Sequence, residues 1–182
     1  MSQLQLITSA NQAFLEANPE LPKLNKAPQR HIAIVTCMDT RLVNFAEEAI
    51  GIKRGEATVI KAAGNGIWTT GLSDIVVSLL VSIYELGVQE IFIMGHECCG
   101  MTHASTNSLG TQMLQSGIKP EDIEKFKSEL SKWVDDFKDP IENVKNSVKC
   151  VRENPLIPKN IPVHGLLIHP DTGKVTTIID GY

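Results

Sequence analysis

Two short stretches of the sequence gather side chains that can bind a metal ion or hold a proton. The first is Cys37-Met-Asp-Thr-Arg41 and the second is His96-Glu-Cys-Cys-Gly100. Cys37, His96 and Cys99 offer two thiols and an imidazole, the donor types that tetrahedral zinc prefers. Three protein ligands leave a fourth position for water or substrate, as in catalytic zinc sites. The sequence therefore predicts a reactive zinc centre, the alternative being that Cys37 is a small buried apolar residue.

Asp39 and Arg41 point to the same side as Cys37 if the backbone stays extended past residue 37. Two arrangements are then open. Asp39 can fill the fourth zinc position and close the site, or Arg41 can hold Asp39 away in a charge-assisted pair and leave that position to water. In the second arrangement the carboxylate would orient a bound hydroxide by accepting its proton in a hydrogen bond. Zinc can supply that hydroxide, because it lowers the pKa of bound water to about 7. A structural salt bridge at the start of a loop is the remaining interpretation.

The elements around these stretches alternate between strand and helix. Runs of apolar and β-branched residues predict strands at 31–38, 57–63, 89–95, 161–169 and 175–179. Helical spacing of apolar residues and helix-boundary signals predict helices at 4–17, 42–50, 72–86, 120–136 and 140–153. Residues 101–120 are expected to be irregular or weakly helical.

This alternation indicates an α/β fold with right-handed crossovers, in which the last two strands form an antiparallel hairpin. A topological switch point arises if the first and third strands are neighbours and the second lies outside the first. Both reactive stretches would then meet at the carboxyl ends of adjacent strands, where open α/β sheets bind ligands.

Length and composition fit one globular domain. The 182 residues are 42% hydrophobic and 21% charged, so a sizeable core can form. The net charge of -4 and the lack of a basic run argue against general binding to nucleic acid or anionic membranes. Neither a secretory signal nor a membrane span stands out, so we expect a cytoplasmic protein. We expect residues 1–182 to form a single domain, with residues 1–25 as a helical arm on its outside or on a second subunit.

Together with Ala63-Gly-Asn65, the two reactive stretches resemble the motifs of the β-class carbonic anhydrases, above all the short prokaryotic-type members. The likeness extends to Val163-His-Gly165 and Asp171-Thr-Gly173, so it covers most of the chain. The combined C-x-D-x-R and H-x-x-C pattern is highly specific.

The resemblance implies zinc on Cys37, His96 and Cys99, with an Asp39–Arg41 dyad beside it. It implies reversible hydration of carbon dioxide to bicarbonate and a proton. The fold that it implies is a mostly parallel sheet of strand order 2-1-3-4, with a fifth antiparallel strand and flanking helices. It also implies homodimers or multiples of dimers with active sites near the interface, which favours a partner-reaching role for the N-terminal helix.

The chain departs from the family pattern at two positions. Ala62 stands where many members carry a polar side chain, and Cys98 is an extra thiol. We expect Cys98 to pack behind the site, with redox sensitivity or ligand swapping as the alternative. Gly64 is expected to bring a backbone amide close to the substrate, because glycine permits the closest approach. His103 could carry protons out of the site, although an exposed loop histidine is the simpler description.

Two rival functions remain. Hydrolysis of carbon disulfide or carbonyl sulfide occurs on the same family scaffold, and the shape of the access pocket would separate it from carbon dioxide hydration. A non-catalytic zinc protein, with Asp39 locked on the metal, belongs to another class. The intact Asp39–Arg41 pair counts against that second rival.

Overall fold

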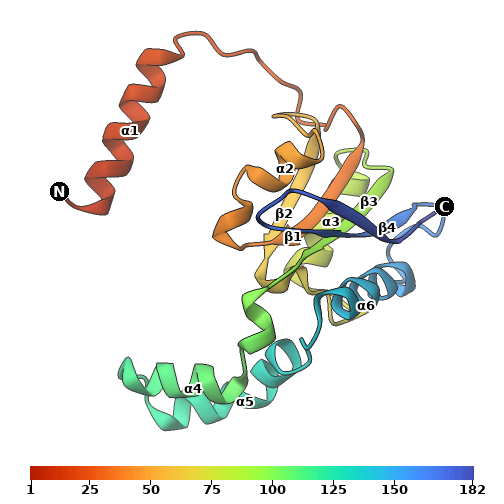
Figure 1. Ribbon diagram of the computed structural model, residues 1–182. Helices are drawn as coiled ribbons and strands as arrows, with labels where there is room; N and C mark the ends of the chain where they lie inside the picture. The colour runs from red at the N-terminus through yellow and green to blue at the C-terminus, as the bar shows by residue number, and fades with distance from the viewer.

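The sheet is built around β1 (Ile32–Cys37), whose residues are all buried. The computed structural model describes residues 1–182. β1 pairs in parallel with β2 (Ala57–Ala62) and with β3 (Glu90–His96). β3 pairs in parallel with β4 (Val163–Ile168), and β4 pairs antiparallel with β5 (Val175–Ile179). The order β2-β1-β3-β4-β5 confirms the predicted sheet and its antiparallel fifth strand (Figure 1).

Helices cover both faces of this sheet, because both faces of β1 carry apolar side chains. Val35 lies in the core cluster beneath α3 (Asp74–Tyr84) and α6 (Pro140–Glu153). Ile34 points the other way, into a second cluster that includes residues of α2 (Phe45–Ala49). Burial on both faces explains why β1 reads as a continuous apolar run rather than an alternating one.

The segment 101–120 holds a regular helix, which corrects the expectation of an irregular or weakly helical segment. α4 (Thr106–Gln115) packs against α5 (Pro120–Val134), away from the sheet (Figure 1). Ser105 and Ser108 cap the start of α4 reciprocally, and Asp135 accepts a hydrogen bond from the Thr106 backbone N–H at 2.7 Å. The usual sequence signal for such a cap has Glu or Gln at the third helical position, so a serine there gave a weak prediction.

The N-terminal helix α1 (Gln3–Ala17) stands clear of the rest of the chain. An extended segment connects it to the sheet, and none of its residues is buried (Figure 1). Its apolar side chains, among them Leu4, Ile7 and Phe14, are exposed. None of the helices, α1 included, has the length and apolar character that would let it cross a membrane.

Candidate metal centre

The two reactive stretches meet where β1 and β3 end beside each other. Cys37 is the last residue of β1, and His96 is the last residue of β3. Because these strands are parallel neighbours, their carboxyl ends lie at the same edge of the sheet. Cys99 follows directly, just before the 3-10 helix Gly100–His103. The ligand atoms of Cys37, His96 and Cys99 lie within 4.8 Å of one another, and all three residues are buried.

The geometry of this cluster fits a zinc ion. The Sγ atoms of Cys37 and Cys99 are 4.0 Å apart, close to the separation of about 3.8 Å for two sulfurs on one tetrahedral zinc. His96 Nδ1 hydrogen-bonds to the carbonyl oxygen of Glu97 at 2.9 Å. Its Nε2 is buried and has no hydrogen bond. An imidazole fixed through one nitrogen, with the other free and facing two sulfurs, is the usual arrangement of a ligating histidine.

The electrostatics of the cluster favour a cation. The hydrogen bond from the Cys99 thiol lowers the pKa of Cys37 against the effect of burial, and His96 lowers it further. The same contact raises the pKa of Cys99, because a second negative charge beside the first is unfavourable. Burial alone would lower the pKa of His96, but contact with Cys37 and the Glu97 carbonyl raises it overall. A divalent metal ion bound here would displace the protons that these groups share.

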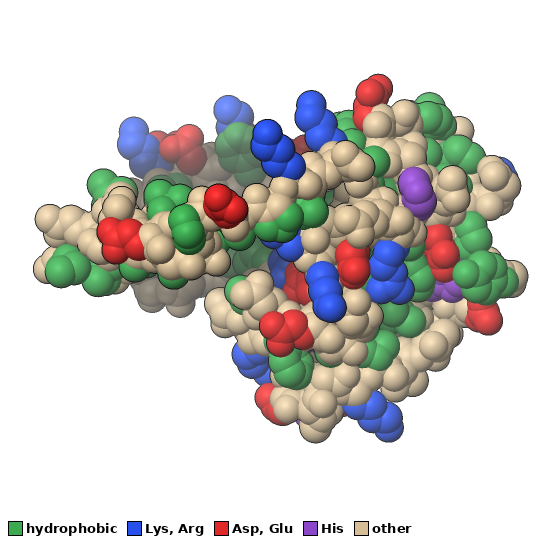
Figure 2. Space-filling model, turned by 90° about the horizontal axis from the view of Figure 1, so that it is seen from above, with side chains coloured by type: hydrophobic (Ala, Val, Ile, Leu, Met, Phe, Trp, Pro, Cys, Tyr) green, Lys and Arg blue, Asp and Glu red, His purple; other side chains and the backbone are tan.

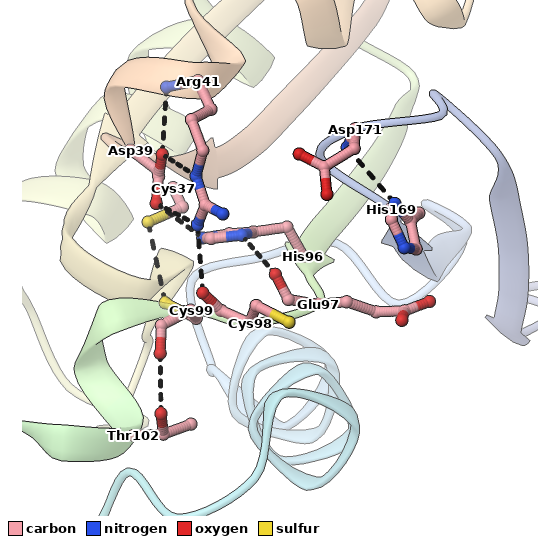
Figure 3. A network of polar contacts seen from close by, with 10 residues as sticks. All are labelled: Cys37, Asp39, Arg41, His96, Glu97, Cys98, Cys99, Thr102, His169 and Asp171. Atoms are coloured by element: carbon pink, nitrogen blue, oxygen red, sulfur yellow. Dashed lines mark hydrogen bonds and ion pairs between the residues drawn. The ribbon is translucent and has the colours of Figure 1, made fainter.

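Asp39 and Arg41 form a bidentate ion pair beside the cluster (Figure 3). Arg41 Nε donates to Asp39 Oδ1 at 3.0 Å, and Arg41 Nη2 donates to Oδ2 at 2.8 Å. The Arg41 backbone N–H also donates to Oδ1, at 2.9 Å. These hydrogen bonds hold the pKa of Asp39 well below its usual range, so the carboxylate is ionised at neutral pH. Asp39 Oδ2 lies 3.8 Å from His96 Nε2, so Asp39 borders the cluster while Arg41 holds it.

Cys98 supports Arg41 through its backbone, which corrects the expectation that its thiol packs behind the site. The thiol is exposed. Cys98 has a left-handed backbone with φ of 53°, and its carbonyl oxygen accepts a hydrogen bond from Arg41 Nη2 at 3.0 Å. This contact is not predictable from sequence, because a backbone carbonyl acceptor has no residue-type signature.

Gly64 lines the same hollow as Cys37 and Cys99, and α6 holds it through a hydrogen bond. Its backbone amide contributes to the lowered pKa of Cys37, so it faces that sulfur. Its carbonyl oxygen accepts a hydrogen bond from the buried Asn143 side chain at 2.7 Å. Ser147, one turn further along α6, accepts a hydrogen bond from the Ile67 backbone N–H at 3.0 Å. Asn143 and Ser147 do not stand out in the sequence. Their only signal is that they form a polar pair at helical spacing on a helix face that is otherwise apolar.

Two hollows adjoin each other at the site. One, of about 400 Å³, is lined by the Asp39–Arg41 segment, by Cys37 and Cys99 and by Gly64. The other, of about 580 Å³, is mostly apolar and shares Met38, Ala63 and Met101 with the first. Ala62, Trp68 and Trp133 also line this second hollow, and the two indole rings pack edge to face at 5.2 Å. The small Ala62 thus leaves an apolar approach to the cluster.

Two other histidines, His103 and His164, lie apart from the cluster. His103 is exposed at the end of its 3-10 helix. His164 has a structural role, since its Nδ1 accepts a hydrogen bond from the Gly181 backbone N–H at 3.0 Å and its ring stacks on Phe92. The structure therefore brings together three of the predicted ligands, the Asp39–Arg41 pair and Gly64, and leaves His103 outside.

Gly64→Ala is expected to destabilise the protein by about 1–3 kcal/mol, because the new methyl group would overpack this site. Gly64 has φ of 61°, and an added Cβ would lie 2.7 Å from Phe137 Cε2 and 3.1 Å from Met101 Cγ. Gly110→Ala, in the middle of helix α4, is the matched control, since its nearest neighbour would be Ile123 Cγ2 of α5, at an ordinary contact distance of 3.6 Å. That change should stabilise by up to about 1 kcal/mol. Urea unfolding would measure both, and equal stabilities for the two variants would contradict the account of Gly64.

Comparison with known proteins places the chain in a family. A family model described as carbonic anhydrase matches residues 32–175. The crystal structure of β-carbonic anhydrase isoform I from the protozoan Trichomonas vaginalis is 93% identical, with a TM-score of 0.99 and 100% coverage of both chains. β-Carbonic anhydrase 1 of Mycobacterium tuberculosis is 31% identical over 153 residues, covering 83% of each chain.

A relative with a different named activity also matches. The carbon disulfide hydrolase of Acidithiobacillus thiooxidans is 30% identical over 157 residues, covering 80% of this chain and 76% of its own. The family match, the near-identical fold and the Cys37–His96–Cys99 cluster agree with one another. The chain belongs to the β-class carbonic anhydrase family, as its motifs predict.

Proposed function

We propose that this protein is a zinc enzyme that reversibly hydrates carbon dioxide to bicarbonate and a proton. The observation that carries the proposal is an ionised carboxylate, held by an arginine, at the edge of a buried two-thiol, one-imidazole cluster. Cys37, His96 and Cys99 would hold the ion. When bound, zinc supplies the Lewis acidity that makes water a nucleophile at neutral pH.

The residues around the cluster have distinct tasks in this proposal. Asp39 can only accept hydrogen bonds when ionised, so it orients the attacking oxygen by accepting its proton in a hydrogen bond. Arg41 holds Asp39 in that position through two side-chain hydrogen bonds. Gly64 acts on Cys37 through its backbone amide and lines the hollow in which substrate would bind. The adjoining apolar hollow suits an uncharged substrate such as carbon dioxide.

Hydrolysis of carbon disulfide or carbonyl sulfide is the second candidate function. The same apolar hollow would admit these linear, uncharged molecules. A relative named carbon disulfide hydrolase shares 30% identity with this chain. The third possibility, a non-catalytic zinc protein, requires Asp39 on the metal, whereas Asp39 here is bound by Arg41.

Stopped-flow hydration of carbon dioxide by protein of verified zinc content would test the proposal. We expect rapid, saturable hydration between about pH 7 and 9, where the proposed nucleophile forms. The same preparation should be assayed for sulfide release from carbon disulfide and carbonyl sulfide. Zinc-loaded protein that releases sulfide but does not hydrate carbon dioxide would support the second candidate. Protein inert with all three substrates would support a non-catalytic role.

We further propose that the protein is a homodimer in which α1 packs on a second copy of the chain. A helix of about 15 residues is marginal when isolated in water, so α1 needs a surface to pack against. Its apolar side chains are exposed along the projecting arm (Figure 2). A cytoplasmic location is also part of the proposal, supported by four cysteines that are all free.

Replacing apolar residues of α1 by aspartate is expected to turn the dimer into a monomer. The test variant is Ile7→Asp with Phe14→Asp, two exposed side chains on one face of the helix. Ser9→Asp introduces a charge on the opposite face and should leave the dimer intact. Light scattering after size-exclusion chromatography measures the mass. A dimer that survives the double substitution would show that α1 does not hold the subunits together.

A further inference from the structure

Arg41 has hydrogen-bonding capacity that the described pair does not use. A guanidinium group carries five N–H donors on three nitrogens. Nε and Nη2 of Arg41 donate to Asp39, and Nη2 also donates to the Cys98 carbonyl oxygen. Nη1 makes no hydrogen bond in the structure. The Arg41 side chain is 42% exposed, against 17% for Asp39, so the outer side of the guanidinium faces solvent.

Asp171 lies on that outer side, across the guanidinium from Asp39 (Figure 3). It belongs to the turn between β4 and β5, and its carboxylate makes no hydrogen bond or ion pair. After Asp39, it is among the charges that raise the pKa of Arg41. Asp171 is therefore an unpaired carboxylate facing the unused nitrogen of Arg41.

The turn that carries Asp171 is fixed in place. The Asp171 backbone N–H donates to His169 Nδ1 at 3.2 Å, and the Gly173 N–H donates to the His169 carbonyl oxygen at 3.0 Å. Gly173 sits against Phe45 of α2, where an added Cβ would lie 3.3 Å from Phe45 Cζ. Because α2 follows the short 3-10 helix Thr40–Leu42, this contact places the turn beside Arg41.

We propose that Asp171 is a positioning residue, an alternative partner that receives the guanidinium of Arg41 when Arg41 leaves Asp39. The inference rests on the proposed function, in which Asp39 works while Arg41 holds it. The guanidinium then has two carboxylate partners, one inside the site and one at its rim. Transfer to Asp171 releases Asp39 to turn toward the metal ligands. Asp171 thereby raises the population of the state in which Asp39 is free. Because exposed ion pairs are weak, this increase is no more than about fivefold.

The first test removes the inner partner. In a crystal structure of zinc-loaded Asp39→Ala protein, the Arg41 guanidinium should lie about 3 Å from the Asp171 carboxylate. In the Asp39→Ala, Asp171→Asn double variant it should leave that place. Asp39→Asn serves as a second inner variant if the alanine variant does not fold. Arg41 held only by the Cys98 carbonyl, or turned into solvent, would overturn the proposal.

The second test keeps Asp39 intact. Arg41 Nε–H exchanges with solvent when the guanidinium leaves Asp39, and NMR resolves it easily because only Arg30, Arg54 and Arg152 give other such signals. Asp171→Asn should slow this exchange by up to about fivefold in zinc-loaded protein, since the outer partner is gone. Loss of a negative charge alone would speed base-catalysed exchange, so slower exchange cannot be explained by the change in charge.

Two variants control the exchange measurement. Asp171→Glu keeps the outer carboxylate and should restore the natural rate. Glu121→Gln removes an exposed charge from α5 and should leave the rate unchanged. Unchanged or faster exchange in Asp171→Asn would contradict the proposal. Neither test uses carbon dioxide, so failure here is distinct from failure of the hydration assay.

Discussion

Cys37→Ser protein is expected to purify without stoichiometric zinc and to hydrate carbon dioxide at least about a hundredfold more slowly. Mutation of a residue that only orients a metal ligand lowers metal affinity or activity by about 10- to 100-fold. Cys37 is proposed as a ligand itself, so a larger loss is expected. Its sulfur lies 4.0 Å from that of Cys99, so a hydroxyl in its place removes one of the two soft donors. Zinc content by atomic absorption and rates by stopped flow measure the two effects.

Cys150→Ser is the matched control, because it makes the same atomic change away from the cluster. Cys150 lies half-buried on α6, where burial raises the pKa of its thiol. We expect this variant to keep its zinc and its rate. Natural zinc content and activity in Cys37→Ser would remove Cys37 from the ligand set.

Asp39→Asn is expected to keep zinc but to lower kcat/KM by about 10²- to 10³-fold. Positioned proton-handling groups contribute on this scale, and an amide replaces an ionised acceptor with a neutral group that also donates. The three proposed ligands are untouched, so zinc content should stay at that of the natural protein. Loss of zinc in parallel with activity would instead make Asp39 a structural part of the metal site.

Arg41→Gln separates the roles of the two partners. If Arg41 acts through Asp39, the double variant Asp39→Asn, Arg41→Gln should be little slower than Asp39→Asn alone. The effects of two residues that act as one unit are not additive. Multiplying effects would show that Arg41 acts independently on the reaction.

The sequence predicts the sheet well, because β1 and β3 are buried on both faces and therefore appear in the sequence as continuous apolar runs. The ends of the predicted strands lie within two residues of the observed ends, and β5 matches its predicted range. The cluster is predictable once these strands are recognised, because Cys37 and His96 are the last residues of two neighbouring parallel strands. Residue type at a strand end is local information, and the topology converts it into proximity.

The support around the cluster was not predictable, because it consists of long-range contacts without local signatures. The Cys98 carbonyl reaches Arg41 across 57 residues of sequence, and Asn143 reaches Gly64 across 79. The exposure of the Cys98 thiol is not predictable, because the residue type does not reveal the left-handed backbone at this position. Helix α4 is only weakly indicated by the sequence, because its capping signals are weak and its packing on α5 is a tertiary contact.

The hydrogen bonds from α6 to the loop of Gly64 and Ile67 link the metal site to cooperative unfolding. The Ile67 amide donates to a fully buried Ser147 hydroxyl, so it can exchange its proton only when α6 separates from the sheet. That separation would also release the loop whose amide faces Cys37. A metal ion that binds only the native arrangement therefore raises the free energy of this opening by mass action. The resistance of α6 and the sheet to thermal unfolding therefore depends on whether a metal ion is bound at the carboxyl ends of β1 and β3.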